Sequence, residues 1–142
     1  MLEDDLVEEE KKVIVESQKI LEEPNLAVHA TCVRVPILRT HSEALNLQFE
    51  LPITKELAYQ TLSKAKGIRL LEDFSKNRFP MPCDAHGQEE VFYGRIRKDL
   101  SQKNALDIWV VGDQLLKGSA LNAVQILQEV IRPLSKLLAP NK

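Results

Sequence analysis

The segment from Ala44 to Leu51 limits the fold more than any other part of the chain, because apolar and polar residues alternate along it. Its apolar positions fall on one face and are Leu45, Leu47, Phe49 and Leu51. A period of two is the period of a β-strand, and a strand with one apolar face lies in a sheet that is covered on one side. The segment therefore predicts a half-buried strand in a mostly antiparallel sheet.

Four more segments have the β-branched and aromatic composition of strands. They are residues 27–35, 68–71, 90–98 and 106–111. The first of them, Ala27 to Val35, is almost continuously apolar, so we expect both of its faces to be at least partly covered. Together these segments predict a sheet of at least four strands.

Three segments have the periodicity of helices. Residues 6–21 carry an apolar stripe among Glu and Lys residues. A second helix is predicted to begin after Thr54, a good N-cap, and to end at Gly67. A third is predicted over residues 115–138, with Pro133 ending or kinking it. This third helix is more apolar than a surface helix of a small domain needs, so we expect it to pack on something beyond this sheet.

These elements predict one α+β domain over residues 1–142, with a mixed, mostly antiparallel sheet packed with helices. With 44% hydrophobic residues, the chain can bury one substantial core. A formal charge of −2 provides no basic field, so we expect no nucleic-acid partner. No apolar run approaches the roughly 20 residues that cross a bilayer. The N-terminal segment is acidic where a secretory signal would be basic and then apolar, so the prediction is a cytoplasmic protein with no membrane partner.

Residues 73–88 contain prolines and show little periodicity, which predicts a long ordered loop. Cys83, Asp84 and His86 lie within it, but their spacing matches no metal-binding motif. Cys32 and Cys83 are too few for a disulfide framework, so both are predicted to be free thiols. The sequence therefore predicts no metal site.

The segment RVPILRTHSE, from Arg34 to Glu43, places a guanidinium and an imidazole close together in the sequence. On an unbroken strand the odd spacing of Arg34 and His41 would turn them to opposite faces. Both reach one small substrate only if the chain bends, and a bend is predicted at Pro36 to Arg39. Two readings stay open from these residues alone. They are a site that holds a carboxylate and moves a proton, or a strand and loop with two ordinary surface side chains.

Several separate stretches of the chain, in the same order, resemble bacterial aspartate-semialdehyde dehydrogenases. They are EEEKK, ATCVRVPILRTHSEA, KNRFPMP, EVFYGRIRKD and LDIWVVGDQLLKGSALNAVQI. The resemblance covers about Glu8 to Ile131, and several motifs in order are more specific than any one of them. It is to the catalytic and dimerisation half of the enzyme, whose fold is like that of the C-terminal domain of glyceraldehyde-3-phosphate dehydrogenase.

The resemblance implies an NADP-dependent oxidoreductase of amino-acid biosynthesis. The reaction is the NADPH-dependent reductive dephosphorylation of L-aspartyl 4-phosphate to L-aspartate 4-semialdehyde and inorganic phosphate. It stands at the branch leading to lysine or diaminopimelate, threonine, methionine and isoleucine. The resemblance also implies a homodimer that is formed through the sheet face of this domain.

The same resemblance assigns roles to five residues. His41 is the general acid/base, and Arg34 binds the substrate α-carboxylate through a guanidinium that can form two parallel hydrogen bonds. Glu9 contacts the substrate ammonium and Lys12 helps to hold the phosphate. From their spacing alone, these two residues are an ordinary solvated ion pair at i, i+3. Gln114 lies close to the active site and the nicotinamide.

Two parts of the family's machinery are expected to be absent from the chain. In the family, the nucleophilic cysteine and the glycine-rich NADP-binding domain lie upstream of the matched segments, and neither Cys32 nor Cys83 matches the motif of that cysteine. We therefore expect a domain that is incomplete at its N-terminus, NADP bound mainly by a missing N-terminal domain, and an inactive isolated chain. The C-terminal helix, residues 115–138, is expected to pack on that missing domain.

Three hypotheses about function stay open. The chain is the catalytic and dimerisation part of an aspartate-semialdehyde dehydrogenase, or a non-catalytic interaction module that pairs with full-length subunits, or one half of a split enzyme. Co-purification with a full-length subunit without added turnover would support the second hypothesis. Restored activity on mixing with an NADP-binding half would support the third. The preference for NADP over NAD is left open, because no residue in the chain is expected to bind the ribose phosphate.

Overall fold

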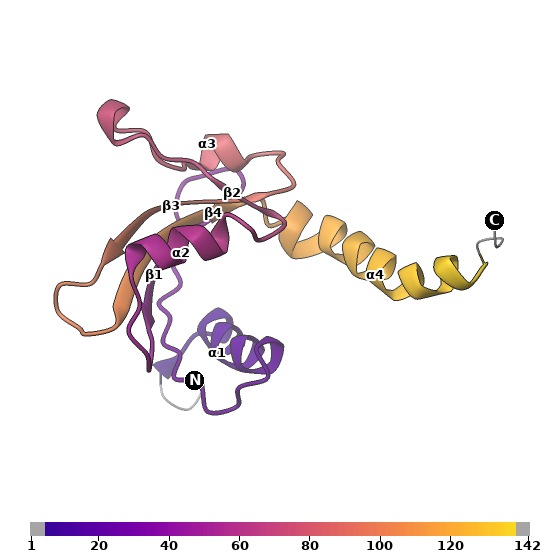
Figure 1. Cartoon of the computed structure of the whole chain (residues 1–142), viewed down its shortest axis with the longest axis horizontal. Coiled ribbons are helices and arrows are strands. Elements are labelled where there is room, and N and C mark those ends of the chain that lie inside the picture. Colours follow the sequence, from indigo (N-terminus) through magenta and orange to yellow (C-terminus); the bar gives the residue numbers. More distant parts are fainter. Residues whose placement is uncertain (1–4, 139–142) are drawn as a thin grey trace. The chain divides into compact units, whose positions relative to one another are not determined.

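The computed structural model describes residues 5–138 and divides the chain into two compact units, Met1–Pro36 and Ile37–Lys142 (Figure 1). The four residues at either end of the expected 1–142 domain lie outside the described residues. Each unit is described by itself below. No helix in the described part of the chain is long and apolar enough to span a bilayer.

The first unit contains one helix, α1 (Glu8–Ile20), which agrees with the predicted amphipathic segment. Acidic residues fill its first turn, where they interact favourably with the helix dipole. The carboxylate of Glu10 accepts hydrogen bonds from the backbone amides of Val7, at 3.0 Å, and Cys32, at 2.9 Å. The Cys32 amide, followed by the Val7 amide, lowers the pKa of Glu10. One side chain thus caps α1 and ties the later part of the unit to it.

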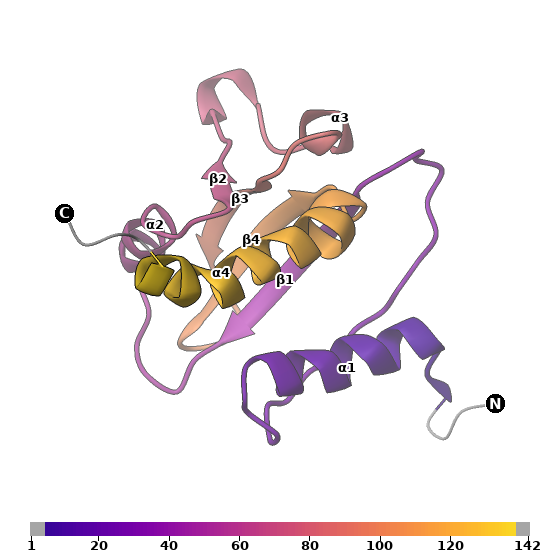
Figure 2. The ribbon, with the colours of Figure 1, turned by 90° about the vertical axis from the view of Figure 1, so that its right-hand side faces the viewer.

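The predicted strand at residues 27–35 is wrong. This stretch is irregular and has no strand partner, and Figure 2 shows a plain loop there after α1. Its Val33 and Val35 side chains are exposed, and the Cys32 amide is bonded to Glu10 rather than to a strand. A β-branched run forms a strand when a neighbouring strand packs and pairs with it. Within the described residues this run has no such neighbour.

The second unit is built on a four-stranded sheet with the order β1-β4-β3-β2. The strands are β1 (His41–Gln48), β2 (Ile68–Leu70), β3 (Val91–Lys98) and β4 (Ala105–Gly112). β4 pairs antiparallel with β1 and β3, whereas β2 pairs parallel with β3. The prediction of an α+β fold with a mixed, mostly antiparallel sheet of at least four strands is therefore confirmed.

The alternating segment that predicted a strand at Ala44 to Leu51 does form β1, but the strand lies further toward the N-terminus. It begins at His41, immediately after the bends at Pro36, Leu38 and Arg39 that the sequence predicted. It ends before Phe49, because the partner strand β4 begins opposite Gln48. The end of β1 is therefore set by where its partner strand begins. The alternation of apolar and polar residues continues to Leu51 and does not mark this end.

One face of the sheet is covered by α2 (Lys55–Leu62). The main core cluster lies on this face, with Tyr93, Ile96, Leu106 and Ile108 buried against Leu45, Ala58, Tyr59 and Leu62. The Thr54 hydroxyl accepts a hydrogen bond from the Leu57 amide at 3.1 Å, which confirms the predicted N-cap. The helix ends at Leu62, earlier than the predicted Gly67, and the Ser63 hydroxyl donates to the carbonyl of Gln60 at its end.

The opposite face is covered at one end by the segment predicted to be a long loop. This segment contains the short helices η2 (Phe74–Lys76) and α3 (Pro82–Ala85), so it is more regular than predicted. Ala85, Phe92 and Val111 form a second buried cluster there, with Leu71 and Trp109 at its border. Gly94 is needed at this point, because a Cβ on it would lie 2.9 Å from the carbonyl oxygen of Leu71.

The chain continues from β4 through a π-helical turn, η3 (Leu116–Ala120), into α4 (Leu121–Leu138). The predicted helix is confirmed over Leu121–Leu138, but Ser119 (φ −143°, ψ −108°) breaks the helical backbone before it, and α4 runs on through Pro133, where the sequence predicted an end or a kink. Figure 1 shows α4 leading away from the sheet. Its apolar side chains are accordingly exposed, including Val124, Ile126, Leu127, Val130 and Ile131.

Candidate functional site

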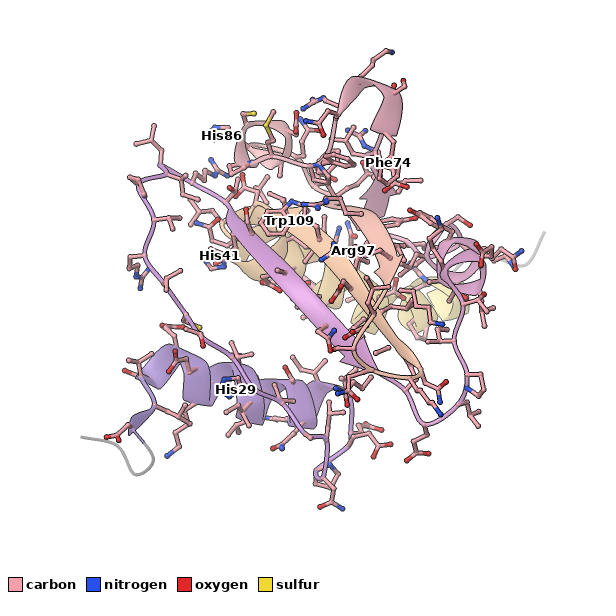
Figure 3. All side chains as sticks on the ribbon, turned by 90° about the vertical axis from the view of Figure 1, so that its left-hand side faces the viewer. His29, His41, Phe74, His86, Arg97 and Trp109 are labelled. Carbon is pink, nitrogen blue, oxygen red and sulfur yellow. The ribbon has the colours of Figure 1, made fainter. Side chains whose placement is uncertain are left out.

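A hollow of about 290 Å³ lies where β1 begins and β4 ends. Both strands and the turn into η3 contribute to its lining, together with β3. The lining residues are His41, Glu43, Val91, Val110, Gly112, Asp113, Gln114, Lys117 and Gly118. His41 pairs with Gly112 in the antiparallel register, so the imidazole stands beside the residue that leads into Asp113 and Gln114. Figure 3 shows His41 at the start of β1.

Gln114 is held at this hollow by the backbone that precedes His41. Its Oε1 atom accepts a hydrogen bond of 2.8 Å from the amide of Thr40. Because a backbone amide can only donate, the side-chain oxygen must face Thr40, and the NH₂ group is the end that can serve as a donor elsewhere. The structure thus brings two of the predicted site residues, His41 and Gln114, to one hollow.

Thr40 has an unusual backbone conformation. Its φ is +89°, a region that β-branched residues rarely adopt, and its side chain is only 3% exposed. Strain of this kind amounts to about 1–3 kcal/mol and persists only where surrounding contacts fix the backbone. The hydrogen bond from Thr40 to Gln114 is one such contact. The turn into β1 is therefore held in place by the far end of β4.

Asp113 is the most buried charged residue of the described chain, with no exposed surface. Its Oδ1 accepts from the amide of Leu115 at 3.1 Å, and its Oδ2 accepts from the amide of Gly87 at 2.7 Å. Nε of Arg39 lies 2.8 Å from Oδ1 and 2.7 Å from Oδ2. Burial on its own would raise the pKa of Asp113, but Arg39 and the two amides together hold that pKa below its usual value.

The rest of the lining includes two charged residues and two glycines. Glu43 and Lys117 bring opposite charges to the hollow, and the Lys117 ammonium also donates to Oε1 of Gln125 at 2.6 Å. Gly112 leaves no room for a larger residue without movement, because a Cβ on it would lie 3.1 Å from Cγ2 of Val91. The hollow thus combines a largely apolar lining, which includes Val91 and Val110, with a few polar and charged groups, and Gly112 adds no side chain to it.

The other three predicted site residues, Glu9, Lys12 and Arg34, belong to the first unit. The Lys12 ammonium lies 3.4 Å from Glu9 and 3.5 Å from Glu8. Glu9, followed by Glu8, raises the pKa of Lys12. The i, i+3 neighbourhood of Glu9 and Lys12 is therefore confirmed, and their predicted substrate contacts remain predictions, as does that of Arg34.

Sequence reasoning missed Arg39, Thr40 and Asp113. Arg39 and Asp113 are far apart in the sequence and make their ion pair only in the folded unit, so no local pattern identifies them. A positive φ at Thr40 could not be read from a residue type that usually avoids it. One signal for Asp113 was available in the sequence. It lies just past the strand predicted over 106–111 and next to Gln114, and polar residues that follow a strand often belong to a site.

A second hollow, of about 390 Å³, lies on the sheet face opposite α2. It is lined by Ala44, Leu45, Asn46, Arg95, Arg97, Asp107, Ile108 and Trp109. Figure 3 shows Trp109 and Arg97 on this face. The Arg97 guanidinium lies 3.3 Å from Asp107, and the Asn46 amide donates to the same carboxylate at 2.9 Å. These groups satisfy one another, so this hollow has a polar network with no group that stands out as catalytic.

Among the residues that the structure describes, no group of three or more His, Cys, Asp or Glu side chains is arranged to hold a metal ion. Cys32 and Cys83 are both free, as predicted, and both are exposed. The first hollow offers an imidazole, a carboxamide, an ammonium and the carboxylates of Glu43 and Asp113.

The chain belongs to the family of semialdehyde dehydrogenase dimerisation domains, whose model matches residues 2–117. Its relatives are aspartate-semialdehyde dehydrogenases, and the chain corresponds to the dimerisation-domain region of those enzymes. The family that the sequence motifs indicated is therefore confirmed.

Similarity to individual enzymes is high over most of the chain. The aspartate-semialdehyde dehydrogenase of Synechocystis is 53% identical over 124 residues, which is 87% of this chain and 37% of that enzyme. The enzyme of Prochlorococcus marinus is 54% identical over 85% of this chain and 35% of its own length. The crystal structure of aspartate semialdehyde dehydrogenase II from Vibrio cholerae complexed with ASA superposes with a TM-score of 0.87. The two sequences are 37% identical, and the match covers 93% of this chain and 39% of the Vibrio cholerae chain. The chain thus spans little more than a third of the relatives it matches.

Proposed function

We propose that these residues form the substrate-binding, acid/base and dimerisation part of an aspartate-semialdehyde dehydrogenase. The reaction is the NADPH-dependent reductive dephosphorylation of L-aspartyl 4-phosphate to L-aspartate 4-semialdehyde and phosphate, in the biosynthesis of lysine, threonine and methionine. The observation that supports the proposal most strongly is the pairing of His41 and Gln114 at one hollow in a chain that is 53% identical to such an enzyme.

His41 is the proposed general acid/base of the reaction. An imidazole can accept and return a proton near neutral pH, which the attack of a thiol and the later steps require. It stands at the first position of β1, where strand pairing with Gly112 fixes its backbone while the side chain remains exposed. The nucleophilic thiol itself is proposed to come from outside these 142 residues, because neither Cys32 nor Cys83 lines the hollow.

Arg34, Glu9 and Lys12 are the proposed substrate-binding residues. A guanidinium can bind the α-carboxylate through two parallel hydrogen bonds. Glu9 carries the charge that would bind the substrate ammonium, and Lys12 the charge that would bind the phosphate. All three side chains are exposed, so they are free of the desolvation that a buried charge would require.

NADP is the proposed cofactor, and the described residues fit only its reactive end. The hollow of about 290 Å³ lies at the small end of the range of ligand sites, which typically measure about 300–1,000 Å³, so we propose that it receives the nicotinamide ring and not the whole dinucleotide. The NH₂ group of Gln114, whose oxygen is held by the Thr40 amide, is a suitable donor toward the nicotinamide carboxamide. NADPH, when bound, supplies the hydride, and the remainder of its site is proposed to lie mainly in a separate NADP-binding domain.

The proposed protein is a cytoplasmic homodimer that binds only small-molecule ligands besides its second copy. The exposed apolar face of α4 is proposed to pack on the NADP-binding domain, because burying it would remove an apolar patch from water. The alternative is a non-catalytic module that pairs with full-length subunits through the dimerisation surface. This alternative is supported by the family match, because the matching family is one of dimerisation domains.

A hybrid enzyme tests the proposed function. The segment of the Synechocystis enzyme that aligns with this chain is replaced by the chain, and NADPH formation is followed from aspartate semialdehyde, phosphate and NADP. We expect turnover, and we expect His41→Ala to lower kcat by about 10²–10⁴-fold. The matched control is His86→Ala, which removes an exposed imidazole at the end of α3 that does not line the hollow.

Other outcomes separate the alternatives. A folded hybrid without turnover, or equal losses from His41→Ala and His86→Ala, would contradict the proposal. Mixing the chain with a separately expressed NADP-binding part of the Synechocystis enzyme tests the split arrangement, and restored turnover would support it. Tight binding of the chain to full-length subunits with no gain in turnover per thiol-bearing subunit would instead support the interaction module.

A further inference from the structure

The ion pair between Arg39 and Asp113 joins three separate segments of the second unit. Arg39 belongs to the bend before β1, Asp113 follows the end of β4, and the Gly87 amide that bonds to Asp113 comes from the loop before β3. The carboxylate has no exposed surface and every one of its contacts is a charge-assisted hydrogen bond. A buried carboxylate with such partners fixes the relative positions of the segments that supply them.

Asp113 lines the hollow itself, and Arg39 lies next to the candidate site in the sequence. Asp113 precedes Gln114, and Arg39 precedes Thr40 and His41. The hydrogen bond of 2.8 Å from the Thr40 amide to Gln114 runs alongside the ion pair and joins the same two segments. Two parallel links therefore hold the backbone at the start of β1 against the backbone that follows β4.

The strained backbone at Thr40 gives this arrangement a clear purpose. A φ of +89° at a β-branched residue persists only where the surrounding structure fixes it. Relaxation would rotate the peptide that leads into His41 and move its imidazole relative to the Gln114 carboxamide. The Arg39–Asp113 pair holds the residue before Thr40, and strand pairing with Gly112 holds His41 after it, so the two contacts are placed to oppose that rotation.

We propose that Arg39 and Asp113 are positioning residues that hold the His41 imidazole and the Gln114 carboxamide in one fixed arrangement at the hollow. The catalytic consequence rests on the proposed function, whereas the positioning itself is a property of this chain. A displacement of about 1 Å in a catalytic group can lower a rate by about 100-fold, so the loss of the ion pair changes kcat more than substrate affinity.

The Arg78–Asp84 pair provides a matched control. It is a second Arg–Asp ion pair in the same unit, in which Nη1 of Arg78 lies 3.0 Å from Oδ2 of Asp84, and the same carboxylate accepts from the Met81 amide at 2.9 Å. It fixes the start of α3 and does not line the hollow. Arg78→Gln therefore removes the same chemistry without touching the segments that carry His41 and Gln114.

Amide hydrogen exchange on the 142-residue chain tests the positioning directly. We expect Arg39→Gln to lower the protection of the Thr40 amide by at least about tenfold relative to the amide of Tyr93 in the sheet, and Arg78→Gln to leave that ratio unchanged. Equal loss at both amides, or no loss at Thr40, would overturn the proposal. If Arg39→Gln fails to fold, Arg39→Lys, which keeps the charge but lacks the Nε–H, is compared in the same way.

Kinetics of the hybrid enzyme then tests the catalytic consequence. We expect Arg39→Gln to lower kcat by about 10- to 100-fold with KM for the semialdehyde changed less than about twofold, and Arg39→Lys to recover part of the loss. If the folded fraction of Arg39→Gln falls while kcat per folded molecule stays constant, the positioning role is overturned. A wild-type hybrid with no turnover would contradict the proposed function, and the exchange ratio would still decide whether Arg39 positions Thr40.

Discussion

The two ends of the sheet face under α2 are made by the same strands and differ in what they enclose. At one end Leu106 and Ile108 of β4 are buried beneath α2. At the other end β4 finishes in Gly112, and the space beside it is the hollow lined by His41 and Gln114. Val110 lies between the two, packed against the core cluster and lining the hollow.

This difference shows how one alternating strand can build both a core and a site. The pleat directs every second residue of β4 to the α2 face, whatever its type. Where those residues are large and a helix covers them, they form a core. Where the last of them is glycine, the same face leaves a hollow beside His41 and Gln114. Residue size and cover, rather than register, separate the two regions.

Truncation of the core end is expected to have the largest effect on stability. Leu106 is 3% exposed and Leu47, its partner in the β1–β4 register, is 40% exposed. We expect Leu106→Ala to lower the free energy of unfolding by about 2–5 kcal/mol and Leu47→Ala by less than about 1 kcal/mol. Urea denaturation measures both. Equal losses of stability would show that Leu106 and Leu47 are buried to the same extent.

Removal of the buried carboxylate at the hollow end is expected to change how stability depends on pH. The pKa of Asp113 is lowered in the folded chain by Arg39 and two amides despite its burial. Such a group stabilises the fold fully above its unfolded pKa of about 4, and this contribution is lost as pH falls through the folded pKa. We therefore expect wild-type stability to fall below about pH 4 and the fall to be shallower in Asp113→Asn.

Urea denaturation at a series of pH values from neutral to acid measures this dependence. The control is Asp99→Asn at the β3–β4 hairpin, because hydrogen bonds from Ser101 and Asn46 lower the pKa of Asp99 to about 2 at a position that is less buried than Asp113. Asp113→Asn should lower stability at neutral pH more than Asp99→Asn does. An acid slope identical to that of wild type in Asp113→Asn would show that this carboxyl does not contribute to it.

Filling the glycine at the end of β4 is expected to have a moderate effect. A Cβ at residue 112 would approach Val91 to 3.1 Å, so Gly112→Ala should reduce stability by about 1–3 kcal/mol. Because the crowding comes from the Val91 side chain, Val91→Ala in the same chain should recover part of the loss. A double-mutant cycle by urea denaturation measures the coupling. Additive losses would show that the two side chains do not compete for one space.

The smallest effect is expected at the start of α2. Thr54→Ala removes the side-chain cap and should reduce stability by about 1 kcal/mol. Thr61→Ala is the control, because the Thr61 hydroxyl donates only to the Leu57 carbonyl within the same helix and alanine is the better helix former. Neither substitution should change kcat of the hybrid enzyme, since α2 covers the core end alone. A changed kcat in Thr54→Ala would link the two ends.

The sheet was predictable where each strand could be recognised by itself. The alternation before Leu51 predicted β1, and β-branched runs predicted β2, β3 and β4, because all four find partners in one sheet. The run from Ala27 to Val35 has the same composition and forms no strand, since local composition does not reveal whether a neighbour exists. Helix starts such as Thr54 were also predictable, because a cap depends on residues close in sequence.

The candidate site was predictable only in part. His41 and Gln114 came from motif resemblance, and the structure brings both to one hollow. The contacts that hold them, from Arg39 and Asp113, depend on segments that meet only after the sheet has formed. A residue that acts through such a contact has no periodicity, spacing or composition to distinguish it. These supporting residues are therefore the part of a site that a single sequence conceals.

The left-handed backbone at Thr40 has a consequence for directed evolution of this chain. Glycine adopts a φ near +89° without steric strain, so a library selected for thermal tolerance alone is expected to enrich Thr40→Gly. A library selected for turnover is expected to retain threonine, because glycine widens the range of backbone conformations before His41. Position 40 is thus a place where the two selections should choose different residues.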